Sequence, residues 1–266
     1  MTNESKGLAV ITGASTGIGA VYADRLARRG YDLLLVARDQ SRMTALADRL
    51  RAETGRKIDI RSVDLTDPEK LAALAARIEG ESRLALLVNN AGMSIKDSLL
   101  TGDPSEPARL IALNITAPTV LAGAAGRNLV KAGKGGIINL SSVLALAPEM
   151  FEGAYSASKA YILNLSIALA RDLSEAGVRV QAVLPGATRT EIWERSGKDV
   201  NAFPPEWVME PGDLVDAALA GFDAGEVVTI PPLADEGLWK TAQEARLALG
   251  PNLSRREVAA RYRKAA

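Results

Sequence analysis

Near its amino end the chain reads Gly7-Leu8-Ala9-Val10-Ile11-Thr12-Gly13-Ala14-Ser15-Thr16-Gly17-Ile18-Gly19. Its first six residues are almost all apolar, as expected of a strand that is covered on both faces. Glycines at a Gly-x-x-x-Gly-x-Gly spacing follow, and an apolar helical pattern then runs through Leu26 to a stop at Gly30. Glycines let a backbone approach a pyrophosphate, and a helix N-terminus offers free N–H groups to it. We therefore predict nucleotide binding here, the alternative being an ordinary glycine-rich turn.

Strand and helix patterns alternate along the rest of the chain. Strands are expected at 32–37, 58–63, 84–88, 135–142, 178–184 and 227–230, and helices at 41–53, from Pro68, at 106–130, from Tyr155 to Leu169 and at 213–222. This order predicts an α/β fold, a Rossmann-like, doubly wound, seven-stranded and mostly parallel sheet with helices on both faces. We expect one domain over residues 1–266, because neither a linker nor a repeat interrupts the pattern.

Three segments depart from this regular alternation. Residues 187–211 are rich in polar residues with interspersed aromatics, which favours a long irregular lid over the strand ends. Residues 233–266 predict a tail of two helices, the second beginning at the capping-box pattern Ser254-Arg255-Arg256-Glu257. Within the helix expected at 106–130, Pro118 cannot donate a hydrogen bond to the carbonyl of Asn114, so we expect a kink there.

The composition excludes several classes of chemistry. The 266 residues are 47% hydrophobic, and 32 basic side chains balance 32 acidic ones, which does not indicate a nucleic acid or an anionic membrane as partner. The chain has neither cysteine nor histidine, which excludes disulfides, a thiol nucleophile, a Ser-His-Asp triad and most zinc sites. Residues 1–6 are polar and no apolar run approaches 18 residues, so we expect a cytoplasmic protein without a membrane anchor.

A tyrosine and a lysine four residues apart are the candidate acid–base pair. Tyr155 and Lys159 would share one helix face, about one turn apart. Two unit charges ~4 Å apart interact by roughly 4 kcal/mol at an effective dielectric of ~20, so the ammonium would lower the pKa of the phenol by about 2 units. The strand expected before this helix ends at Ser141-Ser142, which could bring Ser142 within reach of Tyr155. The alternative is a half-buried tyrosine beside a solvated lysine.

The polar and glycine-rich segments all come directly after predicted strands. They are residues 13–19, 37–38, 64–65, 89–92, 141–142 and 185–190. In open parallel sheets the ligand lies outside the carboxyl ends of the strands, so we expect these segments to converge on one crevice.

Two charged residues are candidates for binding an adenosine at this crevice. Arg38 follows Ala37, where an acidic residue would bond a ribose 2′-hydroxyl; a guanidinium instead suits a 2′-phosphate, which favours NADP(H) over NAD(H). Alternatively Arg38, beside Asp39, is a solvated loop charge. Asp64 could bond an adenine amino group, or it could belong to a polar turn.

These motifs together resemble the short-chain dehydrogenase/reductase family in its short single-domain form. The matching residues, over about residues 7 to 230, are Thr12-Gly13-x-x-x-Gly17-x-Gly19, Asp64, Asn89-Asn90-Ala91-Gly92, Asn114, Ser142, Tyr155-x-x-x-Lys159 and Pro185-Gly186. Ser142 is chosen over Ser141 because it stands thirteen residues before Tyr155, as is usual in that family. Two features depart from the family: no basic residue stands in or just after the glycine turn, and the tail matches no general motif.

The resemblance implies a role for each matching residue. Tyr155 would exchange a proton with the substrate oxygen, Lys159 would lower its pKa and hold the nicotinamide ribose, Ser142 would bond the substrate oxygen, and Asn114 would hold a proton-relaying water. Cofactor contacts are implied at Gly13, Ser15, Thr16, Gly17, Ile18, Gly19, Arg38, Asp64, Leu65, Asn90, Ala91, Gly92, Tyr155, Lys159, Pro185, Gly186 and Thr188. No metal would be required, and a homodimer or homotetramer would be expected.

The sequence thus predicts an oxidoreductase that uses NAD(P)(H), preferably NADP(H), on a carbonyl or secondary alcohol substrate. The alternatives are an NADP(H)-binding sensor or scaffold with little turnover, and a dehydratase or epimerase, whose substrate domains are usually longer. Six apolar residues either line a pocket for an apolar or aromatic substrate or pack the lid onto the core. They are Leu144, Met150, Phe151, Trp193, Phe203 and Trp207.

Overall fold

The computed structural model describes residues 4–97, 99–151 and 153–263. Its strands are β1 (Leu8–Thr12), β2 (Asp32–Ala37), β3 (Ile58–Ser62), β4 (Leu84–Asn89), β5 (Gly135–Leu140), β6 (Val178–Val183) and β7 (Val228–Thr229). Within the described residues they form one parallel sheet in the order β3-β2-β1-β4-β5-β6-β7. The order reverses between β1 and β4, which confirms the doubly wound, seven-stranded prediction.

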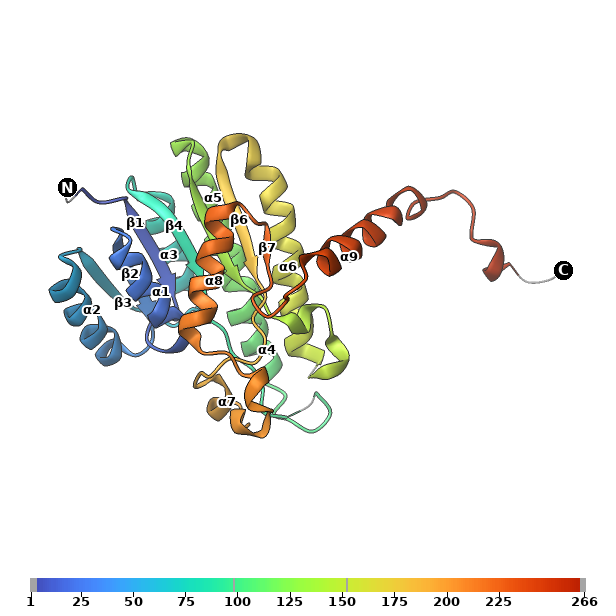
Figure 1. The fold of residues 1–266 in the computed structure, drawn as a ribbon, viewed down its shortest axis with the longest axis horizontal. Coiled ribbons are helices and arrows are strands. Elements are labelled where there is room, and N and C mark those ends of the chain that lie inside the picture. The colour runs from blue at the N-terminus through green and yellow to red at the C-terminus, as the bar shows by residue number, and fades with distance from the viewer. Residues whose placement is uncertain (1–3, 98, 152, 264–266) are drawn as a thin grey trace. The chain divides into compact units, whose positions relative to one another are not determined.

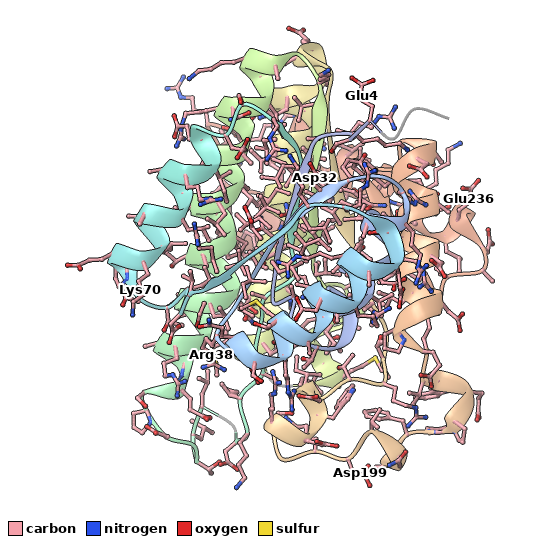
Figure 2. The ribbon with its side chains drawn as sticks, turned by 90° about the vertical axis from the view of Figure 1, so that its left-hand side faces the viewer. Glu4, Asp32, Arg38, Lys70, Asp199 and Glu236 are labelled. Atoms are coloured by element: carbon pink, nitrogen blue, oxygen red, sulfur yellow. The ribbon has the colours of Figure 1, made fainter. Side chains whose placement is uncertain are left out.

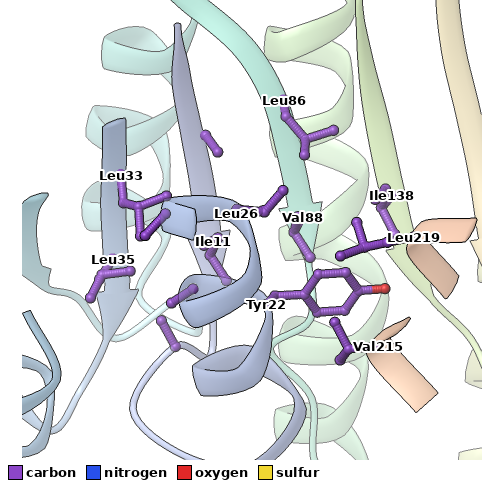
Figure 3. Close-up of a cluster of buried hydrophobic side chains, with 14 of the residues drawn as sticks. Ile11, Tyr22, Leu26, Leu33, Leu35, Leu86, Val88, Ile138, Val215 and Leu219 are labelled. Atoms are coloured by element: carbon purple, nitrogen blue, oxygen red, sulfur yellow. The ribbon is translucent and has the colours of Figure 1, made fainter. Parts of the chain in front are cut away.

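Two layers of helices cover the sheet (Figure 1). One face carries α1 (Gly17–Arg28), α2 (Gln40–Thr54) and α8 (Pro211–Ala224), and the other carries α3 (Pro68–Glu79), α5 (Ala117–Ala132) and α6 (Gly153–Leu173). Both faces of β1 are therefore buried, which explains its unbroken apolar run. Figure 3 shows Tyr22 of α1 among Val88 of β4 and two side chains of α8, Val215 and Leu219.

Caps fix the ends of several helices where the sequence indicates them. The Asp67 carboxylate accepts hydrogen bonds from the backbone N–H groups of Glu69 and Lys70, each at 3.1 Å, and Pro68 occupies the first helical position of α3, as predicted. The Asp39 carboxylate caps α2 in the same way by accepting from the N–H of Arg42 at 3.0 Å. Such caps are typically worth about 1 kcal/mol each.

The helix expected at 106–130 is divided into three parts. They are α4 (Glu106–Ile111), a π-helical turn (Ala112–Thr116) and α5. The N–H of Ala117 bonds the carbonyl of Ala112, five residues back, so the irregularity lies where Asn114 and Pro118 indicate it. By length and composition, Glu106–Ala132 is the one described helix that could cross a membrane; 44% of its apolar window is buried inside the protein, as in a core helix.

The predicted lid, residues 187–211, is irregular with short helical turns. It contains α7 (Ile192–Arg195) and two 3₁₀ turns at Val200–Ala202 and Pro205–Trp207. A parallel bridge between Thr188 and Met209 closes its base, where Met209 N donates to Ala187 O at 2.9 Å and Arg189 N to Met209 O at 3.0 Å. The lid is therefore a loop whose two ends are fixed to each other.

The chain divides after Pro231 into two compact units, and the second unit holds the tail. Its first predicted helix is present as α9 (Glu236–Ala248), which is capped by Asp235. The prediction of a second helix from Ser254 is wrong, because residues 254–263, the part of this segment that the structure describes, contain a single 3₁₀ turn at Ala260–Tyr262. A capping pattern does not stabilise so short a helix without packing, and Leu253 is 75% exposed.

Candidate active site

The segments that follow the strands lie at one end of the sheet (Figure 2). Arg38, just after β2, and Asp199 of the lid lie toward the same end, opposite Asp32 at the start of β2. Parallel strands present their carboxyl ends at one edge, so the glycine turn, the loops after β4 and β5 and the lid meet there.

Ser142, Tyr155 and Lys159 come together at the junction of β5 and α6. Tyr155 lies in the first turn of α6, and the Lys159 Nζ is 5.5 Å from the centroid of its ring. The Ser142 hydroxyl lies close enough to the Tyr155 phenol to lower its pKa, and it also accepts from Leu144 N at 3.2 Å and donates to Pro185 O at 3.5 Å. Ser141 points elsewhere, because its Oγ donates to the backbone carbonyl of Lys159 at 2.7 Å and fixes α6 to the strand end. The structure thus places Ser142, and not Ser141, beside the tyrosine.

Burial controls the charge of this pair. It raises the pKa of Tyr155 to about 12, against a smaller lowering by the Ser142 hydrogen bond, and it lowers the pKa of Lys159 to about 8. The predicted lowering of the Tyr155 pKa by Lys159 is therefore wrong for this state of the protein. The ammonium donates to the backbone carbonyl of Leu140 at 2.9 Å, while the phenol loses its solvation. At pH 7 the site holds a neutral phenol beside a mainly protonated lysine.

Asn114 lies on the π-helical turn and faces the same site. Its side chain is almost fully buried, accepts from Met93 N at 2.9 Å, and donates to Met93 O at 2.8 Å and to Ser158 Oγ at 3.2 Å. A Cβ on Gly92 would lie 3.4 Å from Asn114 Oδ1 and 3.6 Å from Lys159 Nζ. The predicted site residues Gly92, Asn114 and Lys159 are thus brought together.

The glycine turn fits a phosphate group. Gly13 and Gly17 have φ values of +65° and +54°, which favour glycine, and Thr16 at the start of α1 makes no side-chain cap bond. The first N–H groups of α1 therefore remain available for an anion. A Cβ on Gly19 would lie 2.3 Å from the carbonyl oxygen of Gly13. Ser15, Thr16 and Ile18 are partly exposed along this turn.

The residues predicted for the adenosine end differ in their surroundings. Arg38 is exposed, and among the described residues its guanidinium has no ion-pair partner. Asp64 forms a polar turn, because its Oδ1 accepts from Thr66 N at 3.0 Å and from Thr66 Oγ1 at 2.8 Å; these bonds hold its pKa below its usual range. Leu65 is buried in the core, so that only its backbone remains for a ligand.

The loops after β4 and β6 hold the remaining predicted residues in place. Thr12 Oγ1 accepts from the N–H groups of Asn90 and Ala91, each at 3.0 Å. The carbonyl of Pro185 accepts from Val143 N at 2.9 Å, which fixes Pro185-Gly186 next to the serine that precedes Val143. Thr188 is buried and its hydroxyl donates to Gly186 O at 3.1 Å.

Aromatic side chains link the lid to Tyr155. The Phe151 ring stands edge-on to Tyr155 with centroids 5.8 Å apart and to Trp193 at 6.3 Å, and Trp193 contacts Phe203 at 5.0 Å. Three of the six predicted apolar residues are thus brought together. Of the others, Leu144 is partly buried, whereas Met150 and Trp207 are 68% and 61% exposed.

Lys198 was not predicted as a site residue, because its position depends on how the irregular lid folds. Its Nζ lies 4.4 Å from the Phe151 ring centroid and donates to the backbone carbonyl of Ile95 at 3.2 Å. A cavity of about 410 Å³ lies within the lid and reaches Gly17 of the glycine turn. It is lined by Gly17, Arg189, Thr190, Glu191, Trp193, Glu194, Lys198, Asp199, Val200 and Asn201.

No group of three or more acidic side chains arranged to hold a metal ion occurs in the part of the chain that the structure describes.

A sequence model described as short chain dehydrogenase matches residues 7–201. The chain belongs to the short-chain dehydrogenase family. An uncharacterised oxidoreductase of Staphylococcus saprophyticus is 30% identical over 213 residues, which are 80% of this chain and 89% of the relative.

Two solved structures of the family are still more similar. A short-chain dehydrogenase from Sphingobium yanoikuyae in complex with NADPH has a TM-score of 0.94 and 49% identity, covering 97% of this chain and 100% of that one. A bulky-bulky ketone specific alcohol dehydrogenase from Comamonas testosteroni has a TM-score of 0.89 and 44% identity, covering 98% and 99%. As a short-chain dehydrogenase, the protein is an enzyme that acts on alcohol or ketone groups with a nicotinamide cofactor. The comparisons give no support to a sensor or scaffold.

Proposed function

We propose that the protein reduces ketones with NADPH, with Tyr155 as the proton donor. The observation that carries this proposal is the buried phenol of Tyr155, whose pKa burial raises to about 12, beside the side chains of Ser142 and Lys159. A bound nicotinamide supplies the hydride to the carbonyl carbon. Ser142 donates a hydrogen bond to the carbonyl oxygen, and Tyr155 passes its proton to that oxygen, which yields a secondary alcohol.

The remaining residues position the reactants. Lys159 holds the ribose hydroxyls of the nicotinamide half and places a positive charge near the oxygen on which negative charge develops. Asn114 holds a water through which the tyrosine regains its proton. Gly13, Gly17 and the α1 N-terminus bind the pyrophosphate.

We propose a ketone with bulky groups on both sides of the carbonyl as substrate. Phe151 and Trp193 present an apolar, aromatic wall next to Tyr155, and the similar enzyme from Comamonas testosteroni is described as specific for bulky-bulky ketones. With NADPH as reductant, kcat/KM for an aryl ketone with a second bulky arm should exceed kcat/KM for acetone.

Tyr155→Phe tests the proton donor. Its kcat should fall by about 10²–10⁴, as expected for a lost general acid, while calorimetry shows unchanged NADPH binding. Retained turnover would remove Tyr155 from this role.

We propose that Arg38 selects NADPH over NADH. Its exposed guanidinium follows β2, the strand whose end meets the adenosine ribose in dinucleotide-binding folds, and Ala37 offers no carboxylate to a 2′-hydroxyl. The NADPH complex of the similar Sphingobium yanoikuyae enzyme supports this choice. In calorimetric titrations, Arg38→Ala should weaken NADPH binding about tenfold or more, since a hydrogen bond to a charged group contributes roughly 1.5–3 kcal/mol. NADH binding should hardly change; equal losses for both cofactors would show that Arg38 does not contact the phosphate.

We also propose a cytoplasmic homodimer or homotetramer. Val120 of α5 and Tyr161 of α6 are 37% and 40% exposed, which suits a contact between copies. Light scattering of the purified chain should give two or four times the mass of 28.0 kDa, and a monomer at micromolar concentration would contradict the assembly.

A further inference from the structure

An ion pair joins the start of α2 to the start of the lid. The Nη1 atom of Arg42 lies 2.8 Å from both carboxylate oxygens of Glu191, although the two residues are 149 positions apart in the chain. Two neighbouring charges hold the partners in place: Arg195, one turn along α7, contacts Glu191 at 2.6 Å, and Asp39 lies 3.4 Å from Arg42 Nε. The contact therefore connects two distant elements through a small network of charges.

The pair lies beside the groove that the glycine turn forms with the lid. Thr190, directly before Glu191, packs over the turn, because a Cβ on Gly17 would be 3.1 Å from its Cγ2. Gly17 and Glu191 both line the cavity of about 410 Å³. Gly17 begins α1, the helix end at which a pyrophosphate is expected. A dinucleotide bound along this turn would thus lie between α1 and the part of the lid that Arg42 holds.

We propose that Arg42 and Glu191 are positioning residues that strap the lid over the bound cofactor and slow its release. The inference rests on the proposed cofactor site. Arg42 here acts through Glu191 on the lid and not on the cofactor itself, which sets it apart from Arg38. The strap should therefore hold NADPH and NADH alike.

The expected size of the effect follows from the exposure of the pair. The Arg42 and Glu191 side chains are 50% and 38% exposed, and exposed ion pairs contribute little, so we expect cofactor release to become about two- to fivefold faster without the pair. Other contacts keep the lid in place, namely the bridge at its base and the bond from Lys198 to Ile95 O. Salt should reduce the difference between wild type and variants, because exposed charges are screened.

The test is a stopped-flow measurement of cofactor release from the full-length protein. Arg42→Gln, Glu191→Gln and the double variant are compared with wild type for NADPH and for NADH. Arg127→Gln is the matched control, since Arg127 forms a similarly exposed pair with Glu79, at 60% and 35%, that joins α5 to α3. We expect both single variants to release both cofactors about two- to fivefold faster. The double variant should behave like either single one, because the same link between α2 and the lid is lost in each. The control should match wild type.

Three results would overturn the proposal. One is an unchanged release rate in Glu191→Gln, and another is additive effects in the double variant. The third is a loss confined to NADPH in Arg42→Gln, which would make Arg42 a second contact of the 2′-phosphate.

The strap can also be tested without a cofactor. Hydrogen exchange of residues 187–211 in the unliganded protein should be faster in both single variants than in wild type and in Arg127→Gln, and equal exchange would refute it. If the wild type binds neither cofactor, the proposed function fails, and this second measurement still decides whether the ion pair holds the lid.

Discussion

Burial sets the charge states of Tyr155 and Lys159, because it raises the pKa of the phenol to about 12 and lowers that of the ammonium to about 8. The four-residue interval correctly places Tyr155 and Lys159 on one face of α6. It could not show that the ammonium would bond Leu140 O or that the phenol would be desolvated, because both depend on β5 packing against α6. The four-residue interval therefore predicted that the two side chains meet. The direction in which the pKa of Tyr155 shifts could be determined only from the structure.

The pKa of Lys159 predicts a pH profile for the reduction. Tyr155, with a pKa of about 12, stays protonated and able to donate throughout the range from pH 6 to 10. Lys159, with a pKa of about 8, loses its charge as the pH rises through that value. Hence kcat/KM should be constant up to about pH 7.5 and decline above pH 8, by tenfold per pH unit at most.

Steady-state rates with NADPH between pH 6 and 10 test this profile. Lys159→Arg is the control, because a guanidinium remains charged in the whole range. The decline in kcat/KM of this variant should therefore shift to higher pH. A profile that stays level to pH 10 in the wild type would show that the charge of Lys159 is not needed. A decline at the same pH in the arginine variant would assign it to another group.

At the scale of the elements, local signals predicted what local interactions decide. The buried strands, the Asp67-Pro68 helix start and the irregularity at Asn114 and Pro118 each depend on nearby residues, and each is present. The second tail helix also had a local signal at Ser254, but a cap alone cannot offset the cost of helix nucleation. Contacts such as Lys198 with Ile95 had no such signal, because the lid has no periodicity from which a face could be derived.

Alanine at Gly19 in the glycine turn should lower the free energy of unfolding, whereas alanine at Gly123 in α5 should not. A Cβ on Gly19 would lie 2.3 Å from Gly13 O, so β1 and α1 must move apart, at a cost of about 1–3 kcal/mol or more in unfolding free energy. Gly123 lies inside α5, where a Cβ would meet only Arg127 Nη1 at 3.5 Å, so alanine should stabilise by about 0.5–1 kcal/mol.

Urea denaturation of the two variants, with calorimetric titration of NADPH, measures both effects. Gly19→Ala should also weaken NADPH binding, because the displaced turn no longer presents its N–H groups to the pyrophosphate. A stable Gly19→Ala variant with unchanged NADPH affinity would show that close packing of the glycine turn is not what requires this residue.

For the whole molecule, parallel strands bring together segments that are far apart in sequence. The residues after β1, β4, β5 and β6 meet at one edge of the sheet, as predicted from the polar and glycine-rich segments that directly follow the expected strands. Contacts between residues that do not directly follow a strand could not be predicted from the sequence. The ion pair between Arg42 and Glu191 is the clearest case. Such contacts depend on the path of the lid in the folded protein.

The Tyr22 hydroxyl lies deep in the core, where a polar atom is costly to bury. The Tyr22 side chain is fully buried between α1, β4 and α8, and no described residue hydrogen-bonds its hydroxyl. Burial raises the pKa of this phenol far above its usual range, as expected of an unsolvated group. A buried hydroxyl without a partner costs roughly 1–3 kcal/mol, so Tyr22→Phe should stabilise the protein by about 1 kcal/mol while the ring keeps its contacts.

Tyr22→Ala separates the ring from the hydroxyl. It should cost about 3–5 kcal/mol, because it removes the contacts that join α1 to β4 and α8 and leaves a cavity. Urea denaturation of both variants at pH 7, away from any titration of the phenol, gives the two free energies. If Tyr22→Phe were destabilised by more than 1 kcal/mol, the hydroxyl would have a hydrogen-bond partner in solution, and its burial would contribute to the stability of the fold instead of reducing it.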